Sequence, residues 1–245
     1  MCSSVAAARA TQPTKGEPSP QRVPIMLWSW SLDSGPYAEP GVVELLADEE
    51  RAQGRRFATA KLQRRFVAAR AGLRSILGAH LTLDPRRLAF VLNEFGKPAL
   101  GGAPATHFNL SHSGGRAILA VCDHVELGCD LEQVRPIDHL GLARRYFHAA
   151  EVAAIEDAPD APSQALAFFR IWTLKEAFVK ALGIGLSIPL DGFAVSIAGS
   201  TPALTLNPRG TGEAWWLHQA VLPDGYCRAL AAPLGGEAEL ILRTV

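Results

Sequence analysis

The sequence predicts an α+β fold built from two similar α/β lobes. Each half of the 245-residue chain combines short alternating strands with one long helical stretch, at 45–81 in the first half and about 163–182 in the second. No proline- or glycine-rich linker separates the halves near 123–126, so we expect the lobes to pack closely. The expected division is a disordered tail at 1–24, an N-terminal lobe at 25–124 and a C-terminal lobe at 125–245.

The composition is that of a soluble globular protein. Hydrophobic residues make up 48% of the chain and charged residues 20%, which is enough to bury a sizeable core. Lys plus Arg equals Asp plus Glu at 24 each, so no global field favours nucleic acid or membrane, and an anion site must come from local clustering. No apolar run reaches the roughly 18 residues of a membrane span. The chain has four cysteines, Cys2, Cys122, Cys129 and Cys227, and no C-x-x-C pair. We expect them to be buried, reduced thiols of a cytoplasmic protein rather than metal ligands or disulfides.

The first half begins with a strand at 25–32, in which Trp28 and Trp30 alternate with smaller residues before a turn at 33–36. The helical stretch at 45–81 is acidic near its start, as suits the helix dipole, and then strongly basic. This basic cluster is either a solvated helix face or an anion site. Arg65, which lies in an apolar run, is its first candidate for an anion contact. The cluster consists of Arg51, Arg55, Arg56, Lys61, Arg64, Arg65, Arg70 and Arg74.

Two further strands, at 108–113 and 117–122, enclose the sequence Ser111-His-Ser-Gly-Gly115. Small hydroxyl and glycine residues allow backbone and hydroxyl donors to approach an anion closely. The same residues also suit a plain turn between two strands. The residues alone leave both interpretations open.

The next strand carries paired carboxylates in Gly128-Cys-Asp-Leu-Glu132. Side chains alternate along a strand, so Asp130 and Glu132 point to the same face. Like charges on one face repel unless water or a cation lies between them, and hard divalent cations prefer oxygen ligands. The alternative is an edge strand with an exposed polar face.

The second long helix contains Trp172-Thr-Leu-Lys-Glu-Ala-Phe-Val-Lys180 and ends at glycines 183 and 185. Trp172, Glu176 and Lys180 recur every four residues beside an apolar stripe. Glu176 and Lys180 are either an ordinary surface ion pair or part of a working site. Strands follow at 193–197, 203–206, 214–221 and 226–231, and the Pro223-Asp224-Gly225 turn makes the last two a hairpin.

Five pieces in this order resemble the signature of the Sfp-type 4′-phosphopantetheinyl transferases, from the basic helix through Phe193. They are Glu94-Phe-Gly-Lys-Pro98, Phe108-Asn-Leu-Ser-His-Ser113, Gly128-Cys-Asp-Leu-Glu132, Trp172 to Lys180, and Gly183-Ile-Gly-Leu-Ser-Ile-Pro-Leu-Asp191. The resemblance implies a pseudo-dimer of two α/β lobes. It also implies an enzyme that transfers the phosphopantetheine arm of coenzyme A to a serine of an apo acyl or peptidyl carrier protein. Adenosine 3′,5′-bisphosphate is released.

The same resemblance implies roles for individual residues. Asp130, Glu132 and Glu176 match metal ligands that would hold Mg²⁺ against the pyrophosphate of coenzyme A, and Glu176 is the candidate base. Lys180 and Lys175 match lysines that contact phosphate, and Lys180 would also assist the leaving group. Glu151 matches an acid that orients Lys180. The implied contacts to the nucleotide are Arg65, Lys97, Ser111 and His112. Before Gly54 the chain departs from the family pattern, with Glu50 and Gln53 in place of lysines.

Two other classes of function remain open from the sequence. A metal-dependent phosphohydrolase could use the same carboxylates and lysines to activate water, and a non-catalytic module could bind coenzyme A or a carrier protein. By family analogy we expect a monomer with no nucleic-acid or membrane partner. The sequence does not single out one carrier protein.

Overall fold

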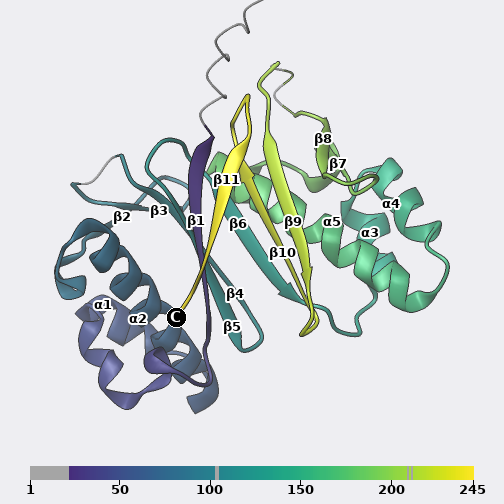
Figure 1. The fold of residues 1–245 in the computed structure, drawn as a ribbon. Coiled ribbons are helices and arrows are strands. Elements are labelled where there is room, and N and C mark those ends of the chain that lie inside the picture. The colour runs from purple at the N-terminus through teal and green to yellow at the C-terminus, as the bar shows by residue number, and fades with distance from the viewer. Residues whose placement is uncertain (1–21, 103–104, 209, 211) are drawn as a thin grey trace, which may run out of the picture.

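A computed structural model describes residues 22–245, apart from 103, 104, 209 and 211. Two sheets lie back to back in the middle of the molecule, and helices cover the outer face of each (Figure 1). Three clusters of buried apolar residues fill the spaces between these four layers. The fold class predicted from the sequence, α+β with two α/β lobes, is confirmed.

The N-terminal lobe holds a four-stranded sheet in the order β11-β1-β5-β4, in which β11 is parallel to β1 and the other pairs are antiparallel. Helix α2 packs on this sheet through the cluster that contains Trp30, Leu73 and Leu77. A small hairpin, β2 and β3, lies beside it (Figure 1). The elements are β1 (Val23–Ser31), α1 (Asp48–Gly54), α2 (Ala60–Leu81), β2 (Phe90–Leu92), β3 (Pro98–Leu100), β4 (His107–Ser113), β5 (Arg116–Cys122) and β11 (Ala238–Thr244).

The C-terminal lobe holds a three-stranded antiparallel sheet in the order β6-β10-β9, covered by α5. The predicted hairpin at Pro223–Gly225 joins β9 to β10 and is confirmed. Gly183 ends α5 in the left-handed conformation, with φ 67°, which glycine adopts without steric cost. The elements are β6 (Gly128–Gln133), α3 (His139–Tyr146), α4 (Ala149–Glu156), α5 (Ala161–Leu182), β7 (Ala194–Ser196), β8 (Ala203–Leu206), β9 (Trp216–Leu222) and β10 (Tyr226–Ala232).

The structure departs from the expected elements in three places. The helical stretch at 45–81 is broken into a 3₁₀ turn, α1 and α2, and α2 starts anew where the Thr59 hydroxyl accepts from the Leu62 N–H. Strand β11 was not predicted, and it pairs with β1, so the last strand of the chain completes the N-terminal sheet. Residues 23 and 24 of the expected tail belong to β1, whereas 1–21 lie outside the described residues.

The helices of the two lobes repeat one plan at a constant offset. Each bound of α5 follows the corresponding bound of α2 by 101 residues, and α4 starts 101 residues after α1. In both lobes a glutamate in the first turn of the short helix binds a cation 24 residues later on the long helix: Glu50 with Arg74, and Glu151 with Lys175. The lobes therefore share an internal geometry that their side chains show only at a few positions.

Of the four cysteines, Cys2 lies outside the described residues, and the burial expected for the other three is confirmed. Cys122, Cys129 and Cys227 are buried and free. Burial raises the pKa of the Cys129 thiol to about 12 and that of Cys227 to about 11. These thiols act as small apolar side chains of the core.

Candidate active site

The site lies where β6 and α5 of the C-terminal lobe meet β4 of the N-terminal lobe. Lys180 extends from α5 and places its Nζ 2.5 Å from Asp130 Oδ1 and 3.1 Å from Ser111 Oγ. Asp130 is only 3% exposed. The structure thus brings together Lys180, Asp130 and Ser111, which come from three separate elements.

A glycine makes this close approach of α5 and β6 possible. A Cβ at Gly128 would lie 2.0 Å from the backbone oxygen of Ala177 and 2.4 Å from the backbone nitrogen of Ala181. Only a residue without a side chain lets the helix backbone rest on the strand at this point. Asp130 lies two residues beyond this contact on the strand, while on the helix Glu176 directly precedes Ala177 and Lys180 directly precedes Ala181. Gly128 therefore sets the distance across which these charges meet.

Alternate side chains of β4 complete the site from the other lobe. Ser111 Oγ donates to Asp130 Oδ1 at 2.9 Å, and Ser113 Oγ donates to Glu132 Oε2 at 2.7 Å. Because Asp130 and Glu132 both receive hydroxyl hydrogen bonds from one strand, they face the same side of β6, as strand alternation predicts. His112 points away from these serines and is exposed.

The electrostatics show that the acidic groups influence one another. Burial, reinforced by the carboxylate of Asp130 and then that of Glu132, raises the pKa of Glu176. Burial also raises the pKa of Glu132, which Ser113 partly opposes. Burial disfavours the ammonium of Lys180, but Asp130 outweighs it and raises the pKa of Lys180. Although part of the His112 side chain is exposed, neighbouring atoms still desolvate its ring, and this desolvation, ahead of repulsion by Lys180, lowers the pKa of His112. Three carboxylates and one ammonium give the cluster an excess of negative charge.

That excess fits a hard divalent cation. Asp130 Oδ2 is buried and has no hydrogen-bond partner, which leaves a carboxylate oxygen available for a ligand. Asp130, Glu132 and Glu176 supply only oxygen donors, the kind that Mg²⁺ prefers. Among the described residues of 22–245, no three His, Cys, Asp or Glu side chains lie close enough together to hold a metal ion in this arrangement. In this arrangement Lys180 Nζ donates to the other oxygen of Asp130, Oδ1.

A cavity of about 280 Å³ opens beside Glu176 and Lys180. Its wall includes the loop at 95–98 from the N-terminal lobe and the end of α5. Lys97 lies in this wall, with its Nζ donating to the backbone oxygens of Leu127 at 3.3 Å and Ala181 at 3.2 Å and to Glu126. The lining residues are Phe95, Gly96, Lys97, Pro98, Asn109, Leu110, Glu176, Val179, Lys180, Gly183 and Gly185.

Arg65 lies at the tip of the β4–β5 hairpin and is not among the residues that line this cavity. Its guanidinium forms a two-pronged pair with Asp33, at 2.8 Å from Nε and 2.5 Å from Nη2. A Cβ at Gly115 would touch both partners, at 2.7 Å from Asp33 Oδ2 and 3.2 Å from Arg65 Nη2. Arg65 therefore borders the hairpin tip and is not brought into contact with Lys97 or Lys180.

The geometry does not support a phosphate contact for Lys175, and this expectation needs correction. Lys175 is 0% exposed, and its Nζ donates to both oxygens of Glu151, at 2.8 and 2.7 Å, and to Phe193 O at 2.7 Å. Glu151 consequently orients Lys175 and not Lys180. Lys175 belongs to the core of the lobe, where Trp172 stacks on Phe168 at 5.8 Å between ring centroids.

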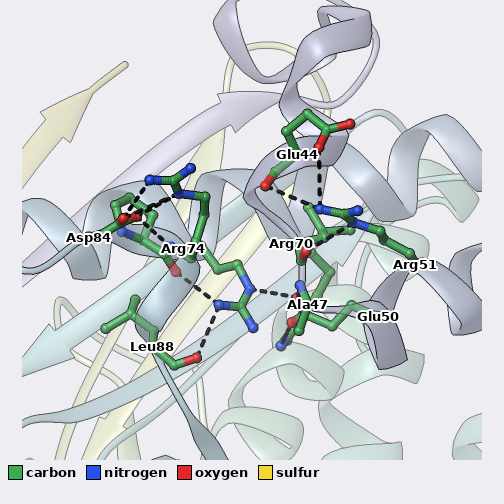
Figure 2. A network of polar contacts seen from close by, with 11 residues as sticks. Glu44, Ala47, Glu50, Arg51, Arg70, Arg74, Asp84 and Leu88 are labelled. Carbon is green, nitrogen blue, oxygen red and sulfur yellow. Dashed lines mark hydrogen bonds and ion pairs between the residues drawn. The ribbon is translucent and has the colours of Figure 1, made fainter.

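The charged residues before Gly54, like Lys175, serve the packing of the fold. Glu50 receives hydrogen bonds from Arg70 Nε and Arg74 Nε, both at 2.6 Å, and Arg74 also donates to the backbone oxygens of Pro85 and Leu88 (Figure 2). Arg51 donates to the Leu46 and Glu44 backbone oxygens. Part of the basic cluster thus ties α1 to α2 and to the segment after it.

Sequence reasoning missed several partners of the site. Ser113, Asp33 and Glu126 were not singled out, although each contacts a candidate residue. Ser113 had a detectable signal, because it follows Ser111 by two residues on a strand, the same spacing that pairs Asp130 with Glu132. Asp33 and Glu126 lie in turns far from their partners in the chain, so no local pattern indicates them.

Comparisons with known proteins agree with this geometry. Residues 126–231 match the family model of the 4′-phosphopantetheinyl transferase superfamily. The chain is 37% identical over 215 residues to the 4′-phosphopantetheinyl transferase HetI of Nostoc sp., covering 86% of this chain and 88% of that protein. It is 34% identical over 155 residues to the 4′-phosphopantetheinyl transferase Sfp of Bacillus subtilis, covering 63% and 68%. Among the described residues, no helix has the length and apolar content to cross a bilayer. The chain belongs to the 4′-phosphopantetheinyl transferase superfamily, whose members transfer the phosphopantetheine arm of coenzyme A to carrier proteins.

Proposed function

We propose that this chain transfers the 4′-phosphopantetheine group of coenzyme A to a serine of an apo acyl or peptidyl carrier protein in a Mg²⁺-dependent reaction. The observation that carries the proposal is the meeting of Asp130, Glu132, Glu176 and Lys180 beside an open cavity between the lobes. Asp130, Glu132 and Glu176 are the proposed ligands of Mg²⁺. When bound, Mg²⁺ would supply positive charge to the pyrophosphate of coenzyme A.

The residues of the chain have distinct tasks in this reaction. Glu176, whose pKa is raised by burial and by Asp130, accepts the proton of the carrier serine hydroxyl. The serine oxygen forms a bond to the phosphorus that carries pantetheine, and the bond from that phosphorus to the bridging pyrophosphate oxygen breaks. Adenosine 3′,5′-bisphosphate leaves with the electron pair, and the Lys180 ammonium offsets its charge.

The nucleotide contacts follow from the walls of the site. Lys97 lines the cavity, and Ser111 and His112 lie on the adjoining strand β4, so all three are proposed to contact coenzyme A. Arg65 is proposed to reach the nucleotide at the hairpin tip after exchanging Asp33 for a phosphate. All these groups lie on one chain, which supports a monomer as the active form. The buried, unpaired cysteines support a reducing cytoplasmic location.

A single mass measurement tests this function. The protein is incubated with coenzyme A, Mg²⁺ and a panel of apo acyl and peptidyl carrier proteins. We expect one phosphopantetheine mass on at least one carrier, and no added mass when EDTA replaces Mg²⁺. A hydrolase would release phosphopantetheine without a carrier. Absence of carrier modification across the whole panel would refute the proposal.

A further inference from the structure

At the site, hydrogen bonds from side chains of one sheet to the backbone of the other join the two sheets, in place of backbone-to-backbone hydrogen bonds. Strand β4 is the edge of one sheet and β6 the edge of the other. Three β4 side chains at every second position accept hydrogen bonds from backbone N–H groups of β6. Asn109 Oδ1 accepts from Cys129 at 2.9 Å, Ser111 Oγ from Leu131 at 3.2 Å, and Ser113 Oγ from Gln133 at 3.2 Å.

The bonding pattern fixes the direction of the Ser113 hydroxyl. A serine hydroxyl has one hydrogen to donate and lone pairs to accept with. The Gln133 N–H uses a lone pair of Ser113 Oγ, so the single hydroxyl hydrogen is directed to Glu132 Oε2, 2.7 Å away. Ser113 therefore locks two successive residues of β6 at once, the backbone of Gln133 and the carboxylate of Glu132.

The carboxylate of Glu132 needs such an anchor. It stands on a flexible side chain next to Asp130, a like charge that raises its pKa after burial does. Asp130 is held by two partners, Ser111 and Lys180, both within 2.9 Å of Oδ1. Ser113 is the hydrogen-bond donor that the structure gives Glu132. Removing its hydroxyl frees the Glu132 rotamers and leaves the rest of the carboxylate cluster in place.

We propose that Ser113 is a positioning residue, which holds the Glu132 carboxylate in the orientation that binds the divalent cation and thereby the coenzyme A pyrophosphate. The inference rests on the proposed function, because it takes Glu132 as a metal ligand. It adds a residue that acts through Glu132 without touching substrate. Groups that orient a metal ligand typically contribute about 10- to 100-fold to metal affinity.

Metal binding can be measured without turnover. Free Mn²⁺ is followed by electron paramagnetic resonance while the protein and coenzyme A are titrated in the absence of carrier. We expect Ser113→Ala to weaken Mn²⁺ binding about tenfold, Ser113→Thr to stay within about twofold of the unmodified protein, and Ser113→Cys, a weaker donor of similar volume, to lie between them. The matched control is Ser196→Ala, because Ser196 also accepts a backbone N–H, from Ala198, and makes no contact with a carboxylate in the part of the chain that the structure describes.

A double-mutant comparison separates positioning from a purely structural role at the seam. If Ser113 acts through Glu132, Ser113→Ala weakens Mn²⁺ binding in the native background but adds nothing in a Glu132→Ala background, which has no side-chain oxygen to position. Equal weakening in both backgrounds, or unchanged Mn²⁺ affinity in Ser113→Ala, refutes the proposal. If Ser113→Ala does not fold, Ser113→Cys takes its place in both backgrounds, and Ser113→Thr serves as the variant that keeps the hydroxyl.

The unmodified protein separates this inference from the proposed function. Transfer of phosphopantetheine by the unmodified protein, combined with undiminished Mn²⁺ binding by Ser113→Ala, overturns the positioning role alone. If the unmodified protein modifies no carrier, the proposed function itself has failed. The midpoint of thermal unfolding of each variant, measured with coenzyme A absent, confirms that the compared proteins are folded.

Discussion

Replacing Lys175 by methionine tests whether this lysine serves the fold or the substrate. The side chains of Lys175 and Glu151 are 0% and 1% exposed, and their oxygen and nitrogen atoms are within 2.8 Å. Lys175→Met leaves the Glu151 carboxylate buried with only the backbone N–H groups of His148 and Val195 as donors. Removing one partner of a buried pair costs about 3–5 kcal/mol.

This loss is large enough to see in a melting curve. For a chain of this size each kcal/mol shifts Tm by about 2–4 °C, so Lys175→Met is expected to lower Tm by roughly 6–20 °C. Circular dichroism or differential scanning fluorimetry measures the shift. At a temperature well below the new Tm, kcat for carrier modification should stay near its native value, because Lys175 does not reach the cavity.

Two further variants make the reasoning refutable. Glu151→Gln, added to Lys175→Met, removes the stranded charge. Its single amide oxygen can accept from only one of the two backbone donors, which bind different oxygens of Glu151, so we expect it to recover part but not all of the lost stability. Lys61→Met, at an exposed lysine, should change stability by no more than about 0.5 kcal/mol. A Tm within 2 °C of native for Lys175→Met, together with a hundredfold fall in kcat, would show that Lys175 contacts phosphate after all.

Four other substitutions follow from the same contacts. Asp130→Ala and Glu176→Ala should each lower kcat on the order of a hundredfold or more while leaving the far-ultraviolet circular dichroism unchanged; near-native kcat with Mg²⁺ in either variant contradicts the assigned roles. Gly128→Ala should both destabilise the protein, by about 1–3 kcal/mol or more, and lower kcat, because the new Cβ would push α5 away from β6; urea titration and carrier assays check the two effects, and a fully stable, active variant argues against the close contact. Glu50→Gln should cost about 3–5 kcal/mol at neutral pH. Although burial opposes ionisation, Arg74 and Arg70 lower the pKa of Glu50 below 4.5, so its contribution is complete above pH 4.5 and is lost as pH falls through the lowered value. The native protein should therefore lose stability more steeply than Glu50→Gln on acidification, and parallel curves would contradict this.

The sequence predicted the parts of the fold whose signals are local. Helix α5 was placed within two residues because it has an apolar stripe and a C-terminal glycine. The alternation of β6 correctly put Asp130 and Glu132 on one face. Strand β11 escaped prediction because its pairing partner, β1, lies at the other end of the chain. The break between α1 and α2 escaped because no proline marks it.

The error at Lys175 has a simple geometric origin. Adjacent residues on an α-helix are rotated by about 100°, since one turn takes 3.6 residues. Lys175 and Glu176 are neighbours in sequence, yet one points into the core toward Glu151 and the other toward the cavity. A motif that lists both residues says nothing about this difference. Only packing of α5 against β7 and α4 decides which lysine is buried.

The internal repeat separates residues of the fold from residues of the site. The buried glutamate and cation recur in both lobes, as Glu50 with Arg74 and Glu151 with Lys175, with the same spacing. At the same offset of 101 residues, Glu176 and Lys180 of α5 correspond to Ser75 and Ala79 of α2, which carry no charge. A pair that both lobes need is explained by stability, since both lobes must anchor a long helix. Charges that occur in only one lobe are not needed for that anchoring. The repeat thus independently supports assigning Lys175 to the fold and Glu176 and Lys180 to the chemistry.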